Sequence, residues 1–180
     1  MLGAAEKFVS EVRALCAEEM SDEERWTKTG EFLRDFASDP EVQEHAKNWP
    51  ATDRTSTGRD KTGNLLFYED PDYGFLVTAM AKEDGHHTTV HDHGEIWTMY
   101  GLVQGAEDIN RFHRDRDEVV HDSTFRIEPG DVDVVPPYLA HQEITIGERS
   151  AAIIIRSERR ARGAELIPYA LEAPAPATGG

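Results

Sequence analysis

The sequence has almost no cysteine, no long apolar run and no excess of basic residues. Cys16 is the single cysteine, which excludes an internal disulfide and fits a reducing compartment. No apolar stretch approaches the roughly 18 residues that a membrane helix needs. Charged residues interrupt the N-terminus where a signal peptide would be apolar, namely Glu6, Lys7, Glu11 and Arg13. These absences predict a cytoplasmic protein with no membrane contact and no secretion signal.

Basic residues are few in comparison with acidic ones. The 19 Lys and Arg residues stand against 35 Asp and Glu residues, so the formal net charge is -16 at pH 7. Such a chain repels phosphate backbones, and no basic stripe offsets the repulsion, so nucleic acid is not an expected partner. With 180 residues, 38% of them hydrophobic and 30% charged, the composition predicts one globular domain.

Residues 1–50 carry a helical pattern. One apolar stripe at near-helical spacing is formed by Leu2, Phe8, Val9, Val12, Leu15 and Cys16, with Cys16 expected to be a buried small hydrophobe. Ser21, followed by three acidic residues, resembles a helix start. Asp39-Pro40-Glu41 predicts another, with proline at the first helical position. We expect these helices to pack on the rest of the domain and to end before Asn48, with an irregular connection over Ala51–Asn64.

From Leu65 onward the pattern changes to short apolar or alternating runs separated by turn residues. Eight such runs occur: LLFY, YGFLVTAMA, IWTMYGLVQG, INRFH, EVVHDSTFRI, VDVVP, QEITI and SAAIIIRS. This arrangement is typical of an antiparallel barrel or sandwich. We therefore expect a β body over residues 51–170 and a disordered Pro/Gly-rich tail over 171–180. The expected barrel core, part of which can also line a pocket, includes Phe75, Trp97, Met99, Tyr100 and Phe125.

Two closely spaced histidines and a third, about 50 residues later, lie within the expected β body. His91 and His93 flank Asp92 in a segment expected to enter a strand, where alternation places both imidazoles on one face, close enough to chelate one ion. Asp92 then faces away, toward solvent or a neighbouring strand. A metal site needs at least one more ligand, and the segment from Gly130 to His141 can supply it by bringing a strand back across the barrel.

The glycines and histidines together resemble the two motifs of the cupin family. The first motif is matched by Gly85, His91, His93 and Gly101, and the second by Gly130, Pro136 and His141. The resemblance covers about Gly85 to Arg156. It implies a mainly β fold, the cupin double-stranded β-helix (jelly-roll barrel) with an N-terminal helical region. It also implies one divalent metal, held by His91, His93 and His141. Barrels of this type commonly pair, so a homodimer is an expectation.

One departure from the cupin pattern narrows the expected chemistry. Most cupins carry a glutamate ligand a few residues after the histidine pair, where this chain has Trp97 and Thr98. Glu95 comes too early, and we do not expect it to coordinate. The remaining three-histidine face is similar to that of the thiol dioxygenases (cysteine and mercaptopropionate dioxygenases) and of a β-diketone-cleaving dioxygenase. The run HDHGEIWTMYGLVQGAED also resembles the thiol dioxygenases.

Three neutral ligands leave a divalent ion its full charge and up to three open positions, which a bidentate anion and dioxygen can occupy. Imidazole suits iron, nickel, copper and zinc, so the ligands do not identify the metal, whereas the resemblance points to Fe(II). The expected function is a non-haem Fe(II)-dependent dioxygenase acting on a small anionic substrate such as a thiol acid. Three alternatives stay open: a dioxygenase cleaving a C–C bond of a β-diketone or hydroxyketone, a non-oxidative Zn or Ni cupin, and a metal-binding sensor without turnover.

Arg156 ends the run SAAIIIRS, an expected central strand, and a buried arginine needs an anionic partner. The thiol dioxygenases place serine, histidine and tyrosine in alternation on this strand, and the matching positions here are Ile154, Arg156 and Glu158. The missing triad counts against a thiol substrate, while Arg156 can serve as a bidentate anchor for a substrate carboxylate. The alternative is a structural salt bridge with Glu143 or Glu158. Weaker anchor candidates lie in the irregular connection: Arg54 and Arg59.

The other histidines receive structural expectations. His86 and His87 precede the motif and are expected in loop or packing positions, or in contact with a ligand side chain. His113 and His121 lie among charged residues and are expected on a solvated hairpin.

Overall fold

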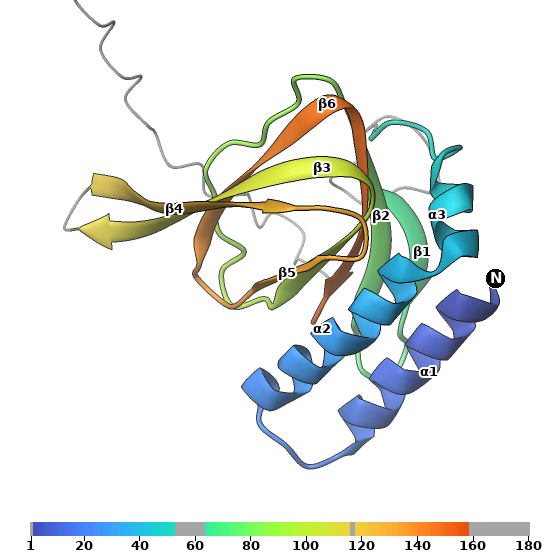
Figure 1. Ribbon diagram of the computed structural model, residues 1–180. Coiled ribbons are helices and arrows are strands. Elements are labelled where there is room, and N and C mark those ends of the chain that lie inside the picture. The colour runs from blue at the N-terminus through green and yellow to red at the C-terminus, as the bar shows by residue number, and fades with distance from the viewer. Residues whose placement is uncertain (1, 53–63, 116–117, 159–180) are drawn as a thin grey trace, which may run out of the picture.

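The computed structural model describes residues 2–52, 64–115 and 118–158 (Figure 1). The predicted tail at 171–180 and the candidates Arg54 and Arg59 lie outside the described residues. Three helices open the chain: α1 (Gly3–Ala17), α2 (Asp22–Ser38) and α3 (Pro40–Ala46). Among the described helices, none is long and apolar enough to cross a membrane.

Two of the helices begin where the sequence predicts. The Ser21 hydroxyl accepts a hydrogen bond from the Glu24 amide at 3.2 Å and caps α2. The Asp39 carboxylate accepts from the amides of Glu41 and Val42 and caps α3, which has Pro40 in its first turn. These caps satisfy amide groups that have no partner inside a helix. Because the capping residues precede each helix directly in the sequence, both helix starts can be predicted from it.

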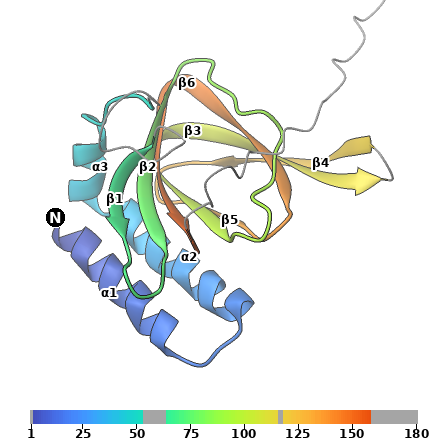
Figure 2. The same cartoon turned by 180° about the vertical axis from the view of Figure 1, so that it is seen from behind.

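In the part of the chain that the structure describes, the β body has six strands: β1 (Leu65–Glu69), β2 (Leu76–Glu83), β3 (Thr98–Asp115), β4 (Glu118–Ile127), β5 (Val132–Val135) and β6 (Ala140–Arg156). Their antiparallel order is β1-β2-β6-β3-β4, and β5 pairs with β3. Figures 1 and 2 show that this sheet curls strongly, and that the β3–β4 hairpin projects beyond it. The predicted class is confirmed: a mainly antiparallel jelly-roll barrel with helices at its N-terminus.

The eight runs of the sequence lie in six described strands, because two strands each contain two runs. The runs IWTMYGLVQG and INRFH both lie in β3, and QEITI and SAAIIIRS both lie in β6. Gly105 and Gly147 have φ of 75° and 79°, a conformation that favours glycine. The register of β3 against β6 shifts between Leu102 and Gln104 and again across Gly105, and then continues to Phe112 and Ala140. These glycines therefore bend the paired strands without ending them, as a bulge does.

The two glycines make a matched pair for a stability measurement. A methyl group at Gly105 would lie 2.0 Å from the Arg149 carbonyl oxygen, whereas one at Gly147 would meet nothing within 4 Å. Gly147→Ala is expected to lower the free energy of unfolding by about 1 kcal/mol, the cost of the backbone conformation alone. Gly105→Ala should lower it by roughly 3 kcal/mol or more, because overpacking is added to that cost. Urea denaturation of both variants measures the difference, and equal losses would contradict the bulge's close packing.

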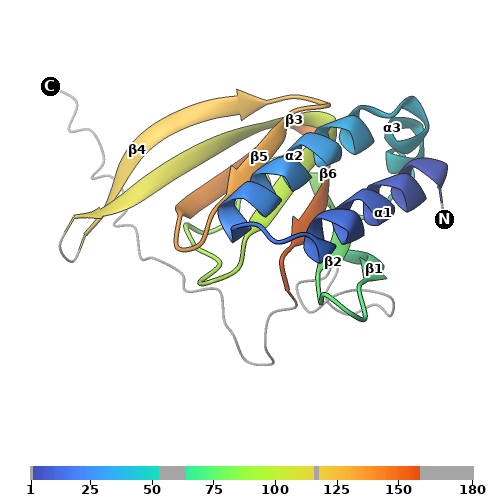
Figure 3. The same cartoon turned by 90° about the horizontal axis from the view of Figure 1, so that it is seen from below.

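The helices cover one face of the barrel, and the main core lies between the two layers. Figure 3 shows α1 and α2 lying across the sheet. Phe8, Leu33 and Phe36 from the helices join Phe75 and Met99 from the barrel in one buried cluster. Gly101 permits this approach, since a Cβ there would lie 2.9 Å from the Leu33 side chain.

The predicted core residues are mostly confirmed. Phe75, Met99 and Tyr100 are buried, Trp97 is half-buried against the core, and Cys16 is half-buried instead of fully buried. The prediction for Phe125 is wrong, because this residue is 39% exposed on the β3–β4 hairpin. There the Arg111 guanidinium lies over the Phe125 ring, with its Cζ atom 5.3 Å from the ring centroid.

Candidate metal centre

Three histidines converge from two distant parts of the chain. His91 and His93 lie in the connection between β2 and β3, and His141 is the second residue of β6. Backbone hydrogen bonds of 3.0 and 2.8 Å join His91 and His141 in an isolated antiparallel bridge. The prediction that the histidine pair enters a strand is wrong, since β3 begins only at Thr98. The bridge to β6, together with a turn at Gly94 (φ 63°), orients the pair instead.

The imidazoles are close enough to share one ion. A donor nitrogen from each of His91, His93 and His141 lies within 4.8 Å of the other two, and the Nε2 atoms of His93 and His141 are 3.0 Å apart. The residues are 4%, 6% and 0% exposed, respectively. The structure thus brings together all three predicted ligands in a buried cluster.

The protonation of these rings fits metal coordination. His91 Nδ1 lies 2.8 Å from the Thr89 carbonyl oxygen, which can only accept, so Nδ1 carries the proton and Nε2 keeps its lone pair. Burial lowers the pKa of His141 to about 3, so its ring is neutral at physiological pH. Neutral imidazole is the form that binds a metal, and it suits iron, nickel, copper and zinc. The donor set fits a divalent transition metal.

Neither acidic residue near the histidine pair belongs to the cluster. Glu95 is exposed and accepts a hydrogen bond from the Tyr138 hydroxyl at 3.2 Å. Asp92, expected to face solvent or a neighbouring strand, is instead buried and accepts the Gly94 amide at 2.8 Å. This hydrogen bond stabilises the turn that follows the histidine pair. The expected strand would have had no such turn. Among the described residues, no carboxylate joins the three histidines within ligand distance.

Glu95→Gln tests whether Glu95 is a metal ligand. We expect the variant to keep its full metal content, because Glu95 bonds to Tyr138 and does not belong to the histidine cluster. Metal content after loading and dialysis, measured by mass spectrometry, is the readout. A tenfold or larger loss of affinity would show that Glu95 reaches the metal.

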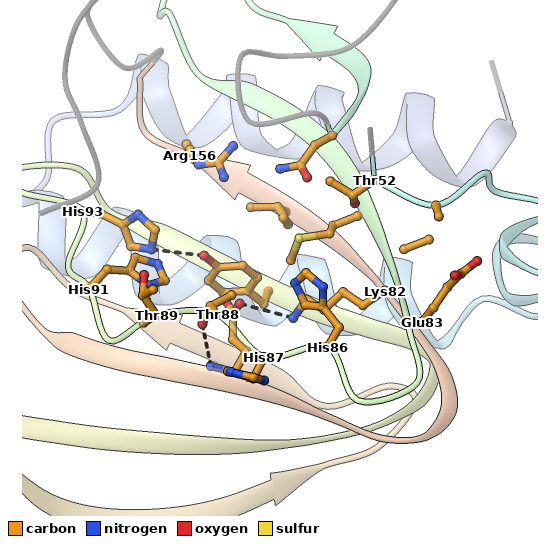
Figure 4. A pocket seen from close by; sticks show the side chains of 17 residues that line it. Thr52, Lys82, Glu83, His86, His87, Thr88, Thr89, His91, His93 and Arg156 are labelled. Carbon is orange, nitrogen blue, oxygen red and sulfur yellow. Dashed lines mark hydrogen bonds and ion pairs between the residues drawn. The ribbon is translucent and has the colours of Figure 1, made fainter. Parts of the chain in front are cut away.

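The histidine cluster borders a cavity of about 480 Å³. His91 and His93 line it, together with Tyr100, Ile154 and Arg156 (Figure 4). The sequence predicts that Tyr100 belongs to the barrel core. In the structure it also lies beside the histidine cluster, with its hydroxyl oxygen 3.1 Å from His93 Nε2. Its register opposite Ile154 aims it at the cavity, and that register is not visible in the sequence.

Arg156 is a buried residue of the cavity wall. It is 6% exposed, and its side chain projects into the cavity that contains His91 and His93 (Figure 4). Ile154, two residues earlier, lines the same cavity, whereas Glu158 is exposed and lines a separate surface hollow. Glu143, one of the two expected salt-bridge partners, has its ion pair with Lys82.

The remaining histidines lie at the margins. His86 and His87 are exposed residues at the rim of the cavity (Figure 4). His113 and His121 lie exposed on the β3–β4 hairpin, as predicted, and His113 is 3.7 Å from Asp122.

A buried charged cluster also reaches the cavity, and the sequence analysis missed it. Lys82 on β2 lies 2.8 Å from Glu107 on β3 and 3.2 Å from Glu143 on β6. Burial lowers the pKa of Lys82, but the two carboxylates raise it more, so the net shift is upward and the amine stays charged. The sequence does contain a signal for this cluster, namely a lysine within the otherwise apolar run LVTAMAKE. A lysine buried in such a strand requires an anionic partner.

Comparisons with known proteins bear on the fold. No protein-family model matches the chain, and no curated protein matches it in sequence. The crystal structure of BH2720 from Bacillus halodurans is similar, with a TM-score of 0.51 and 13% identity over 64% of this chain and 76% of that one. The strand order, the curled sheet and the buried three-histidine face together decide the architecture. The fold is a cupin-type barrel.

Two further structures are similar to this cupin-type chain at lower scores. KdgF from Halomonas sp. has a TM-score of 0.47 and 21% identity, covering 55% of this chain and 80% of that one. The cupin domain of Schizosaccharomyces pombe Cnp3 has a TM-score of 0.44 and 15% identity, covering 52% and 61%. Likeness at these identities concerns the fold alone, and cupin barrels host many functions.

Proposed function

We propose that the protein is a non-haem Fe(II)-dependent dioxygenase that acts on a small chelating anion such as a thiol acid. The observation that carries the proposal is the buried face of His91, His93 and His141, which borders a cavity also lined by Arg156. A neutral ligand set leaves the ion's charge available for an anionic substrate. The cysteine-dioxygenase-like resemblance in the histidine-pair segment supports the same substrate class.

Each residue has a defined role in this proposal. The three histidines hold the metal, and the Thr89 carbonyl keeps His91 in the tautomer whose Nε2 is free to coordinate. Bound iron would supply the redox centre and Lewis acid that oxygen chemistry requires. The Arg156 guanidinium binds a substrate carboxylate through two parallel hydrogen bonds. Tyr100, whose hydroxyl is 3.1 Å from His93, can donate a hydrogen bond to a substrate beside the ligands.

Anaerobic purification followed by metal analysis and an oxygen-uptake screen tests the proposal. We expect about one iron per chain and oxygen uptake with thiol acids such as 3-mercaptopropionate or cysteine, each thiol and one O2 giving one sulfinic acid. Stoichiometric metal without oxygen uptake on any thiol or diketone would contradict it. A non-oxidative Zn or Ni cupin, or a sensor without turnover, would then be the better assignment.

Ile154 favours a second candidate, a dioxygenase that cleaves a β-diketone or hydroxyketone. This residue occupies the position where the thiol dioxygenases carry a serine, and it is a buried apolar residue that lines the cavity. An apolar wall at this point suits a carbon skeleton better than the polar groups of a thiol acid. The same oxygen-uptake screen separates the two candidates, because each predicts a different active substrate.

A further inference from the structure

The charged cluster of Lys82, Glu107 and Glu143 is built asymmetrically. The Lys82 amine donates to Glu107 Oε2 at 2.8 Å and to Glu143 Oε2 at 3.2 Å. All three side chains are at most 2% exposed. One ammonium faces two carboxylates, so the formal net charge of the cluster is -1. Burying such charges costs several kcal/mol per ion unless each polar atom is paired.

Glu107 meets that requirement and Glu143 does not. The second oxygen of Glu107, Oε1, accepts a hydrogen bond from the Ser150 hydroxyl at 2.6 Å. Within the described part of the chain, Glu143 Oε1 has no hydrogen-bond partner, although the residue is only 1% exposed. Burying a carboxylate oxygen without a hydrogen bond costs free energy, so a hydrogen-bond donor from a ligand is expected to pair with Oε1.

The unpaired oxygen belongs to the residue that reaches the cavity. Glu143 and Lys82 line it, together with His91 and Arg156, and the Lys82 side chain is seen in Figure 4. Glu143 is two residues after His141 on β6, so strand alternation places both side chains on the same face. A ligand in the cavity therefore has access to the histidines and to Glu143.

We propose that Glu143 forms a second subsite of the cavity, which binds a protonated amino group of the ligand. Lys82 neutralises only one of the two carboxylates, so the remaining charge favours a cation over a neutral or anionic group. An ammonium supplies the N–H donor that Oε1 requires. A ligand that also met Arg156 would carry a carboxylate at its other end. The subsite lies in the cavity of the proposed function but needs no metal.

Titration of the metal-free chain with matched probes tests the subsite. Butylammonium and 1-butanol have similar shape and differ in charge, and NMR chemical-shift changes report the affinity of each. We expect the wild-type chain to bind butylammonium about ten- to a hundredfold more tightly than 1-butanol. Glu143→Gln should abolish that preference. Equal affinities in the wild type, or an unchanged preference in Glu143→Gln, would overturn the proposal.

Glu107→Gln is the matched control, because it removes the other carboxylate that pairs with Lys82 but does not line the cavity. Because the Glu143 Oε1 acceptor stays while the cluster loses its formal net charge, this variant should weaken the preference for butylammonium less than Glu143→Gln does, without abolishing it. If Glu143→Gln does not fold, the wild type alone still decides with butyltrimethylammonium, which has the charge but no N–H. Weak binding of this probe relative to butylammonium supports the subsite, whereas equal binding overturns it. Failure of the metal site would leave these results unchanged, so the two proposals fail separately.

Discussion

His91→Ala, His93→Ala and His141→Ala are each expected to abolish stoichiometric binding of a divalent metal. The three donor nitrogens lie within 4.8 Å of one another, and in the described part of the chain no carboxylate stands ready to replace a lost ligand. Two imidazoles alone would leave the ion with an incomplete, weakly held set of protein ligands. Metal content is measured by mass spectrometry after anaerobic loading with Fe(II) and dialysis.

His87→Ala is the matched control for these variants. His87 also lines the cavity, but it is exposed and does not belong to the ligand cluster, so the variant should keep its metal. Thermal unfolding of each metal-free variant checks that the barrel is retained, which matters most for the fully buried His141. Near-full metal content in any of the three alanine variants would remove that residue from the ligand set.

Arg156→Lys is expected to raise the KM for an acid substrate by about ten- to a hundredfold. A charge-assisted bidentate contact contributes roughly 1.5–3 kcal/mol, and lysine keeps the charge but cannot reproduce the planar fork of two hydrogen bonds. Oxygen-uptake kinetics with a thiol acid measure the effect. The KM for a neutral diketone should stay unchanged, because such a substrate has no carboxylate for the guanidinium.

Arg149→Lys provides the comparison on the same strand. The Arg149 guanidinium contacts Gln104 and the Trp49 carbonyl, and Arg149 does not line the cavity, so its replacement should leave both KM values unchanged. If Arg156→Lys instead lowers stability and affects acid and neutral substrates alike, Arg156 is a structural residue. The diketone-type activity would then be the better proposal.

The candidate site was predictable from the sequence only in its ligands. The short spacing of His91 and His93 and the second motif ending at His141 identify the three histidines, because their residue type already restricts the chemistry. The sequence did not show which of the expected core residues, Tyr100 among them, would line the cavity, and it did not indicate Glu143 as a site position. Glu143 contacts Lys82 across 61 residues of sequence, and the apolar run around Lys82 indicates that the lysine needs an anionic partner but does not identify it.

The helices and the β class were determined by local signals within the sequence. Caps such as Ser21 and Asp39 act over three residues or fewer, so their hydrogen bonds can be read directly from neighbouring letters. Alternating apolar runs likewise predict strands. A glycine, however, has the same letter whether it ends a strand or bends it, so the sequence does not show that β3 continues past Gly105 and β6 past Gly147.

Only the tertiary structure decided which strand faces form the cavity. Alternation shows that residues two apart share a face, but the register between strands selects the face that turns inward, and a slip of one residue exchanges the two. That register brings Lys82, Glu107 and Glu143 together from three strands and leaves Phe125 on the exposed hairpin. The sequence alone thus identified the three candidate metal ligands, whereas the surroundings that shape the cavity depended on pairings between residues far apart in the chain.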